Sequence, residues 1–315
     1  MIETLQPILA LLDEGLSLYR RNFVGFVLIT ASWFVPVAIC AGLIAFAVSW
    51  LDDFWPVLIV LVGLLLLFPL LIYLIGGLSR AAIAAAEGRA VRFREVMAIH
   101  PLRAAGMGCF TIVYAIVAQF ATSLLSIVCI CPLYLVGLLF FGLTMTATNG
   151  VGTVAGGIIL VVTFLFGWFG SLMISGASGS GLFYGLQPWV QEAHPFGQSI
   201  GRSLELIAYR IGRNLLVWCM AALLIAAAGT SVTATIGTVL SLPLLYALGE
   251  DSPVAQAIAL SAWLIGFMLT LPPLPIWMAL LYQRNRAEHE GMDLQVRVRE
   301  WQDIAIRSQE SESII

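Results

Sequence analysis

The sequence predicts an all-α, polytopic membrane protein with about six transmembrane helices, and two observations lead to that class. First, 60% of its 315 residues are hydrophobic and only 10% are charged, whereas ordinary globular domains carry about 25% charged residues. Second, the stretch from Ala104 to Gln191 contains no Asp, Glu, Lys, Arg or His. Because a membrane helix needs roughly 20 apolar residues per crossing, this stretch must pass through the bilayer at least twice.

The distribution of arginine predicts the orientation of the chain. All fifteen basic residues are Arg, and they lie before the first apolar segment, in the loops 80–103 and 202–213, and in the tail after residue 283. The two other short loops carry only acids, at residues 52–53 and 250–251. Since arginine accumulates in cytoplasmic loops, both termini and both Arg-bearing loops should be cytoplasmic.

Residues 1–22 should form a cytoplasmic amphipathic helix ahead of the first transmembrane hairpin. Their apolar residues recur three and four apart, which is the helical period: Leu5, Ile8, Leu12, Leu16 and Tyr19. No basic segment precedes an apolar core, so we expect the chain to keep this region rather than lose it as a signal peptide. The hairpin then spans 23–78, with its turn at Asp52 and Asp53.

The second hairpin should span 104–188. Arg103 and Arg202 are both expected on the cytoplasmic side, so the number of crossings between them must be even. We favour two long, bent helices, Ala104–Met145 and Val151–Pro188, that turn at Asn149-Gly150. Four shorter crossings are the alternative.

Small and polar residues of this hairpin should hold helices together. Gly181 and Gly185 are four residues apart and would allow another helix to approach closely. Gln119 is the strongly polar side chain farthest inside a crossing, and we expect it to hydrogen-bond to a neighbouring helix. Pro132 should kink the first helix of the pair.

The third hairpin should span 215–282 and repeat the organisation of the first. A second amphipathic stripe precedes it, formed by Phe196, Ile200, Leu204, Ile207 and Ile211, and Val91–Met97 is a shorter, weaker copy. The predicted unit is therefore an interfacial helix followed by a transmembrane hairpin, used three times. The membrane domain covers 23–282. The cytoplasmic tail covers 283–315, and its Leu294, Val298 and Trp301 suggest one further interfacial helix.

Several classes of function are disfavoured by what the sequence lacks. The predicted spans carry no ionisable side chain, which argues against proton- or ion-coupled pumping. The chain has no phosphate-binding Gly-Lys loop, no nucleophile elbow and no paired-histidine zinc motif. The five cysteines fall in apolar segments and are expected to serve in packing. We predict no catalytic residue, cofactor, metal or nucleic-acid partner. A metal or head-group site at His100, His194 and Glu192 would require these residues to converge, and no ligand spacing supports it.

Five short cytoplasmic segments carry motifs of one kind: Pro188-Trp189-Val190-Gln191-Glu192, Ser199–Leu206, Leu281–Arg286, Glu290–Leu294 and Glu87–Glu95. These motifs resemble those of one bacterial family, the integral membrane proteins related to the membrane domain of glycerophosphoryl diester phosphodiesterases. The resemblance implies a hairpin-repeat membrane domain in a prokaryotic plasma (inner) membrane. In that family the phosphodiesterase reaction belongs to a separate soluble barrel. We expect no such barrel within these 315 residues, so no catalytic residue is carried over.

The charged residues of these motifs suggest a cytoplasmic clamp between hairpins. We expect Glu290 and Asp293, after the last span, to pair with the loop arginines Arg202, Arg210 and Arg213. Gly291 is a candidate left-handed cap at the end of the last helix.

The sequence favours a non-catalytic multi-pass membrane protein that acts as a scaffold or an accessory subunit of a membrane complex. Its expected partners are membrane lipids and either other membrane subunits or further copies of itself. The alternative is a transporter or flippase-like protein for an apolar or lipidic substrate, which needs no buried charge. Such a carrier would have a groove between hairpins, lined by residues such as Gln119.

Overall fold

The computed structural model describes residues 2–48, 55–96, 98–146, 150–192, 194–249 and 263–291, and within them the chain is helical and has no strand. The elements are α1 Ile2–Arg21, α2 Phe23–Val48, α3 Trp55–Ala86, α4 Phe93–Val96, α5 Pro101–Met145, α6 Gly150–Gly185, α7 Gln187–Gln191, α8 Phe196–Ala208, α9 Ile211–Leu224, the π-helical turn η1 Ile225–Gly229, α10 Thr230–Leu248 and α12 Pro273–His289. Residues 263–270 are also helical.

Among the residues that the structure describes, four helical segments are long and apolar enough to cross a membrane: Leu102–Thr144, Val154–Gln191, Ile211–Ala247 and Trp263–His289. The predicted all-α class is therefore confirmed, and the helices are compatible with a multi-pass membrane protein. In the described residues of the charge-free stretch, α5 and α6 are the two long helices and α7 is a short third one. The helix α5 continues through Pro132. The predicted turns at 52–53 and 250–251, Asn149 and the tail residues 294–301 lie outside the described residues.

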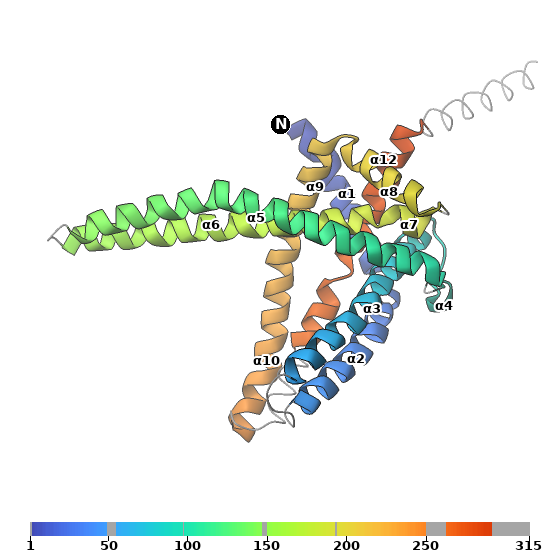
Figure 1. Cartoon of the computed structure of the whole chain (residues 1–315), viewed down its shortest axis with the longest axis horizontal. Helices are drawn as coiled ribbons and strands as arrows, with labels where there is room; N and C mark the ends of the chain where they lie inside the picture. The colour runs from blue at the N-terminus through green and yellow to red at the C-terminus, as the bar shows by residue number, and fades with distance from the viewer. Residues whose placement is uncertain are drawn as a thin grey trace, which may run out of the picture.

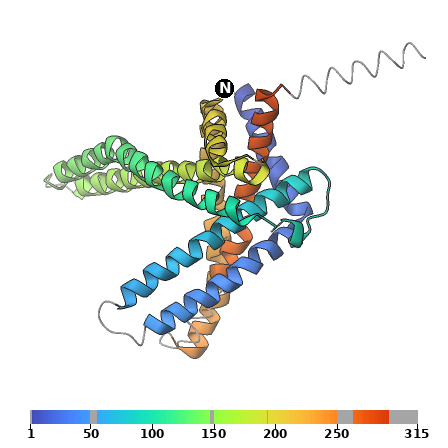
Figure 2. The ribbon, with the colours of Figure 1, turned by 45° about the vertical axis from the view of Figure 1, so that its right-hand side comes forward.

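The helices α5 and α6 lie side by side and project away from the rest of the molecule as an arm (Figures 1 and 2). Glycines allow the close approach: Gly137 lies against the side chain of Thr163, and Gly167 lies against the ring of Tyr134. The α2–α3 pair and α10 run in other directions in both views. The arm and these helices therefore do not share one axis.

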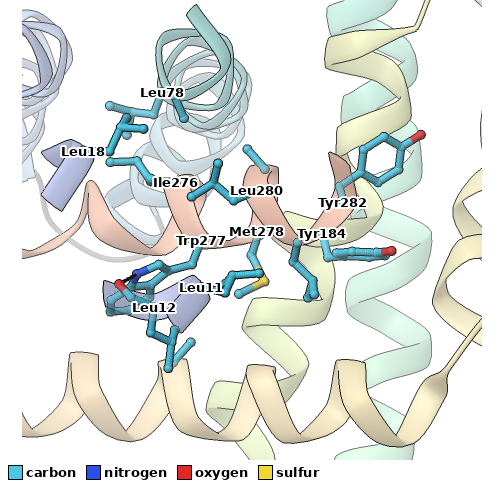
Figure 3. Close-up of a cluster of buried hydrophobic side chains, with 14 of the residues drawn as sticks. Leu11, Leu12, Leu18, Leu78, Tyr184, Ile276, Trp277, Met278, Leu280 and Tyr282 are labelled. Carbon is cyan, nitrogen blue, oxygen red and sulfur yellow. Dashed lines mark hydrogen bonds between the residues drawn. The ribbon is translucent and has the colours of Figure 1, made fainter. Parts of the chain in front are cut away.

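The core is built around α12, which is buried along most of its length (Figure 3). The Trp277 indole Nε1 donates to the carbonyl oxygen of Leu12 at 2.9 Å. The Tyr19 hydroxyl donates to the carbonyl oxygen of Leu269 at 2.8 Å. These contacts attach α1 to the segment Trp263–His289. Burial raises the pKa of Tyr19 to about 12, because desolvation disfavours the charged form of the hydroxyl.

The two amphipathic stripes have different surroundings in the structure. Ile8 and Leu12 of α1 are each 2% exposed and belong to the protein core, so this part of the stripe, expected in the membrane interface, packs against protein instead. In α8, Ser203 and Leu206 are buried while Leu204 stays 59% exposed. The apolar stripe of α8 therefore faces largely outward.

The ends of several helices follow local rules. Pro101 starts α5, as proline does at the first position of many helices, and the His100 Nδ1 accepts a hydrogen bond from the Leu102 backbone N–H at 3.4 Å. Gly291 follows α12 with φ +64°, so its predicted left-handed conformation is confirmed. The weak copy at Val91–Met97 reduces to the single turn of α4, and Met97 lies outside the described residues.

Candidate functional site

A polar network lies where α7, α8, α9 and the end of α12 meet. Its first centre is Glu192, which directly follows α7 and is only 7% exposed. The Tyr282 hydroxyl donates to Glu192 Oε1 at 2.6 Å. His194 Nε2 lies 2.9 Å from Glu192 Oε2, and the Arg286 Nε lies 3.4 Å from Glu192 Oε1. A carboxylate this buried is stable in its charged form only with such partners.

Arg202 of α8 links this centre to the end of α12. Its guanidinium forms an ion pair with Glu290, lies 3.2 Å from Glu205 Oε2 and is 3.9 Å from Glu192 Oε2. Burial lowers the pKa of Arg202, but the hydrogen bond to Glu205 and the charges of Glu192 and Glu290 outweigh that effect and raise its pKa overall. The Arg286 Nε also lies 3.2 Å from Glu290 Oε1. Arg202 and Arg286 therefore each contact both Glu192 and Glu290.

A second centre is Glu288, near the end of α12 and two residues before Glu290. Arg213 Nη1 of α9 lies 3.0 Å from Glu288 Oε1, and Arg210 Nη1 lies 2.9 Å from Glu288 Oε2. Arg210 has φ +60° and separates α8 from α9. Because this residue is in the left-handed region, the chain turns sharply there and brings both arginines to the same carboxylate.

A fully buried asparagine connects this second centre to the helices beneath it. The Asn285 amide Nδ2 lies 2.7 Å from the Tyr184 hydroxyl oxygen and donates to Asn214 Oδ1 at 2.7 Å. Arg213 in turn donates to Asn285 Oδ1, and Asn214 Nδ2 donates to the Leu206 carbonyl oxygen at 3.2 Å. Side chains from α6, α9 and α12 and a backbone carbonyl of α8 therefore share one set of hydrogen bonds.

Of the predicted clamp residues, the structure brings Arg202 and Glu290 together. Arg210 and Arg213 pair instead with Glu288, which the sequence analysis did not single out. Asp293 lies outside the described residues. Asn285 and Asn214 were not predicted from the sequence either. The available signal for Asn285 was an asparagine three residues after the predicted end of the last span, in the segment Tyr282-Gln283-Arg284-Asn285.

The predicted packing residues have different outcomes. Gly181 lies against the Tyr114 hydroxyl of α5 and the Trp218 ring of α9, and a Cβ at Gly185 would lie 2.9 Å from Phe110 Cζ of α5. Both glycines are therefore at helix contacts. Gln119 is exposed, and its Nε2 lies 3.4 Å from Ser123 Oγ on the same helix. The structure does not bring Gln119 to a second helix.

The network is suited to joining helices. Each of the buried or half-buried carboxylates, Glu192, Glu288 and Glu290, has arginine partners, so its charge is compensated within the protein. Over the described part of the chain, no group of three or more His, Cys, Asp or Glu is placed to hold a metal ion.

Comparisons with protein families, with curated proteins and with solved structures found no match to this chain.

Proposed function

We propose that this chain is a non-catalytic, multi-pass membrane protein that acts as a scaffold or accessory subunit of a membrane complex, with lipid contacts. In this proposal three hairpins make six crossings of a prokaryotic plasma membrane, and both termini are cytoplasmic. The segregation of arginine supports the orientation. The resemblance to the membrane domain of the phosphodiesterase-related family stays part of the proposal.

The observation that carries the proposal is the apolar arm formed by α5 and α6. Each membrane-length segment contains a strongly apolar stretch of 18 residues. Only 11% of this stretch is buried in the α5 segment and 6% in the α6 segment, whereas 56% is buried in the segment Trp263–His289. Exposed side chains include Phe120 at 68% and Phe166 at 68%. Contiguous apolar surface of this extent needs lipid or another protein around it.

The length of the arm favours protein contacts in addition to lipid. The helix α5 has 45 residues, which gives about 68 Å at 1.5 Å per residue. The hydrocarbon core of a bilayer is about 30 Å thick, so the arm can stay within it only by tilting strongly. Since the arm also diverges from α10 (Figure 1), a tilted arm beside upright helices would reach sideways from the molecule. Such an arm is suited to holding a neighbouring subunit.

Photo-crosslinking in native membranes tests the proposal. A photoreactive amino acid at Phe120 or Phe166 should give a protein adduct of one defined mass, whose second chain is either a different subunit or another copy of this protein. Val24 of α2 is equally exposed, at 68%, and serves as the matched control position. Adducts with lipid alone at both arm positions, together with purification only as a monomer, would contradict the scaffold role.

The carrier alternative receives no specific support from the described residues. A carrier was expected to have a groove lined by Gln119, but this side chain is exposed and is hydrogen-bonded to Ser123 of the same helix, α5. We therefore advance the scaffold alone.

A further inference from the structure

A cavity of about 630 Å³ lies beside the polar network, between the end of α3, the segment 87–100, the start of α5, α7 and α12. This volume lies in the range of about 300–1,000 Å³ that is common for small-molecule sites. It is formed by parts of the chain distant in sequence, since Arg80 and Arg286 both line it. The cavity lies apart from the exposed surface of the arm on which the proposed scaffold role rests.

The lining of the cavity is strongly cationic. Its arginines are Arg80, Arg89, Arg92, Arg103 and Arg286, whereas Glu87 is its one carboxylate among the described residues. Glu87 is already in an ion pair with Arg89, and Arg286 already lies against Glu192 and Glu290. The lining therefore owes much of its net positive charge to Arg80 and Arg103, which are close enough to repel each other. An anion entering the cavity would relieve this repulsion.

Two features of the lining favour a bound ligand. The Arg80 Nη1 donates to the Ala98 carbonyl oxygen at 2.6 Å, which fixes its guanidinium at the cavity wall. Trp189 also lines the cavity and is 4% exposed, yet its indole Nε1 has no hydrogen-bond partner among the described residues. A buried donor without a partner costs free energy, and a ligand oxygen is one way to satisfy it.

We propose that this cavity binds the phosphate group of an anionic ligand, either a phospholipid head group or a soluble phosphate. Arginine is suited to this role because its planar fork of N–H donors matches two phosphate oxygens at once. Leu102, which neighbours Arg103 in the sequence, is apolar and 77% exposed. An acyl chain could lie against this side chain, which favours the lipid as the source.

The test uses the full-length protein in maltoside detergent, which contains no phosphate. Phosphatidic acid, diacylglycerol and inorganic phosphate are added in turn, and binding is measured by native mass spectrometry and by the shift of the thermal midpoint. Phosphatidic acid should bind and stabilise, and diacylglycerol, which lacks only the phosphate, should not. Binding of inorganic phosphate as well would identify the phosphate group alone as sufficient; binding of the lipid only would identify the lipid source.

Two variants assign the binding to the cavity. Arg103→Gln should weaken phosphatidic acid binding about tenfold or more, because one charge-assisted pair is lost. Arg94→Gln is the matched control. Arg94 is an exposed arginine of the same Arg-bearing region, residues 80–103, and is not among the cavity-lining residues. Arg103 has no ion-pair partner among the described residues, so its loss should not impair folding. Equal binding of phosphatidic acid and diacylglycerol, or equal weakening by Arg94→Gln, would overturn the proposal.

Discussion

At the scale of single residues, opposite charges hold the polar network together: Arg202 pairs with Glu290, and Arg213 pairs with Glu288. The sequence predicts the first pair, because each residue carries charge next to a predicted span and opposite charges on one side of a membrane attract. It does not predict the roles of Glu288 and Asn285, because the apolar pattern ends the last span at Tyr282. In the structure α12 continues to His289, so both side chains lie on a helix that packs against its neighbours.

The ion pair of Arg202 with Glu290 should show direct energetic coupling. Arg202→Ala and Glu290→Ala each remove a partner from a pair that is mostly shielded from water, with side chains 16% and 31% exposed. The double variant should therefore lose about 1 kcal/mol less stability than the sum of the two single losses. The measurement is unfolding in detergent for all four proteins.

The pair of Arg89 with Glu87 is the matched control for this cycle. Its side chains are 64% and 51% exposed, and exposed pairs of this kind contribute little. Strictly additive losses for Arg202 and Glu290, or coupling no larger than that of the control pair, would rule out a clamp at this position.

At the scale of helices, periodicity predicted the elements better than it predicted their surroundings. The stripes before α2 and α9 have the same three-and-four spacing, yet α1 packs into the core while the stripe of α8 faces largely outward. Spacing alone could not separate these cases, because a protein core and a membrane interface both favour an apolar face. The distinguishing signal was on the face beside the stripe, where Ser199 and Ser203 of α8 suit close packing against protein.

Close approach of α6 to α5 and α9 should depend on Gly181. A leucine there would meet the Tyr114 hydroxyl and the Trp218 ring, and overpacking of this kind typically costs about 1–3 kcal/mol. Gly179→Leu is the matched control on the same helix, because a Cβ at Gly179 meets nothing within 4 Å. Thermal unfolding in detergent should show a clear loss for Gly181→Leu alone; similar losses for both variants would refute the packing role.

At the scale of the whole molecule, the sequence predicted a helical membrane protein but not the direction of the arm. The helices α5 and α6 are apolar on all sides, so no stripe marks which face meets the protein. Their exposed surface follows from how α3, α7 and α9 place the hairpin, and these contacts join residues far apart in the chain. The arginine pattern, in contrast, depends only on local composition and predicts one cytoplasmic side for the network and the cavity.

The most direct test of the account is the sidedness of these arginine-bearing segments. In a cysteine-free background, Arg89→Cys should react with a membrane-impermeant maleimide in inside-out vesicles and not in right-side-out vesicles. Asp52→Cys, in an acidic loop expected on the other side, should show the reverse. Labelling of the Arg89 position from outside, or of both positions from the same side, would contradict the account.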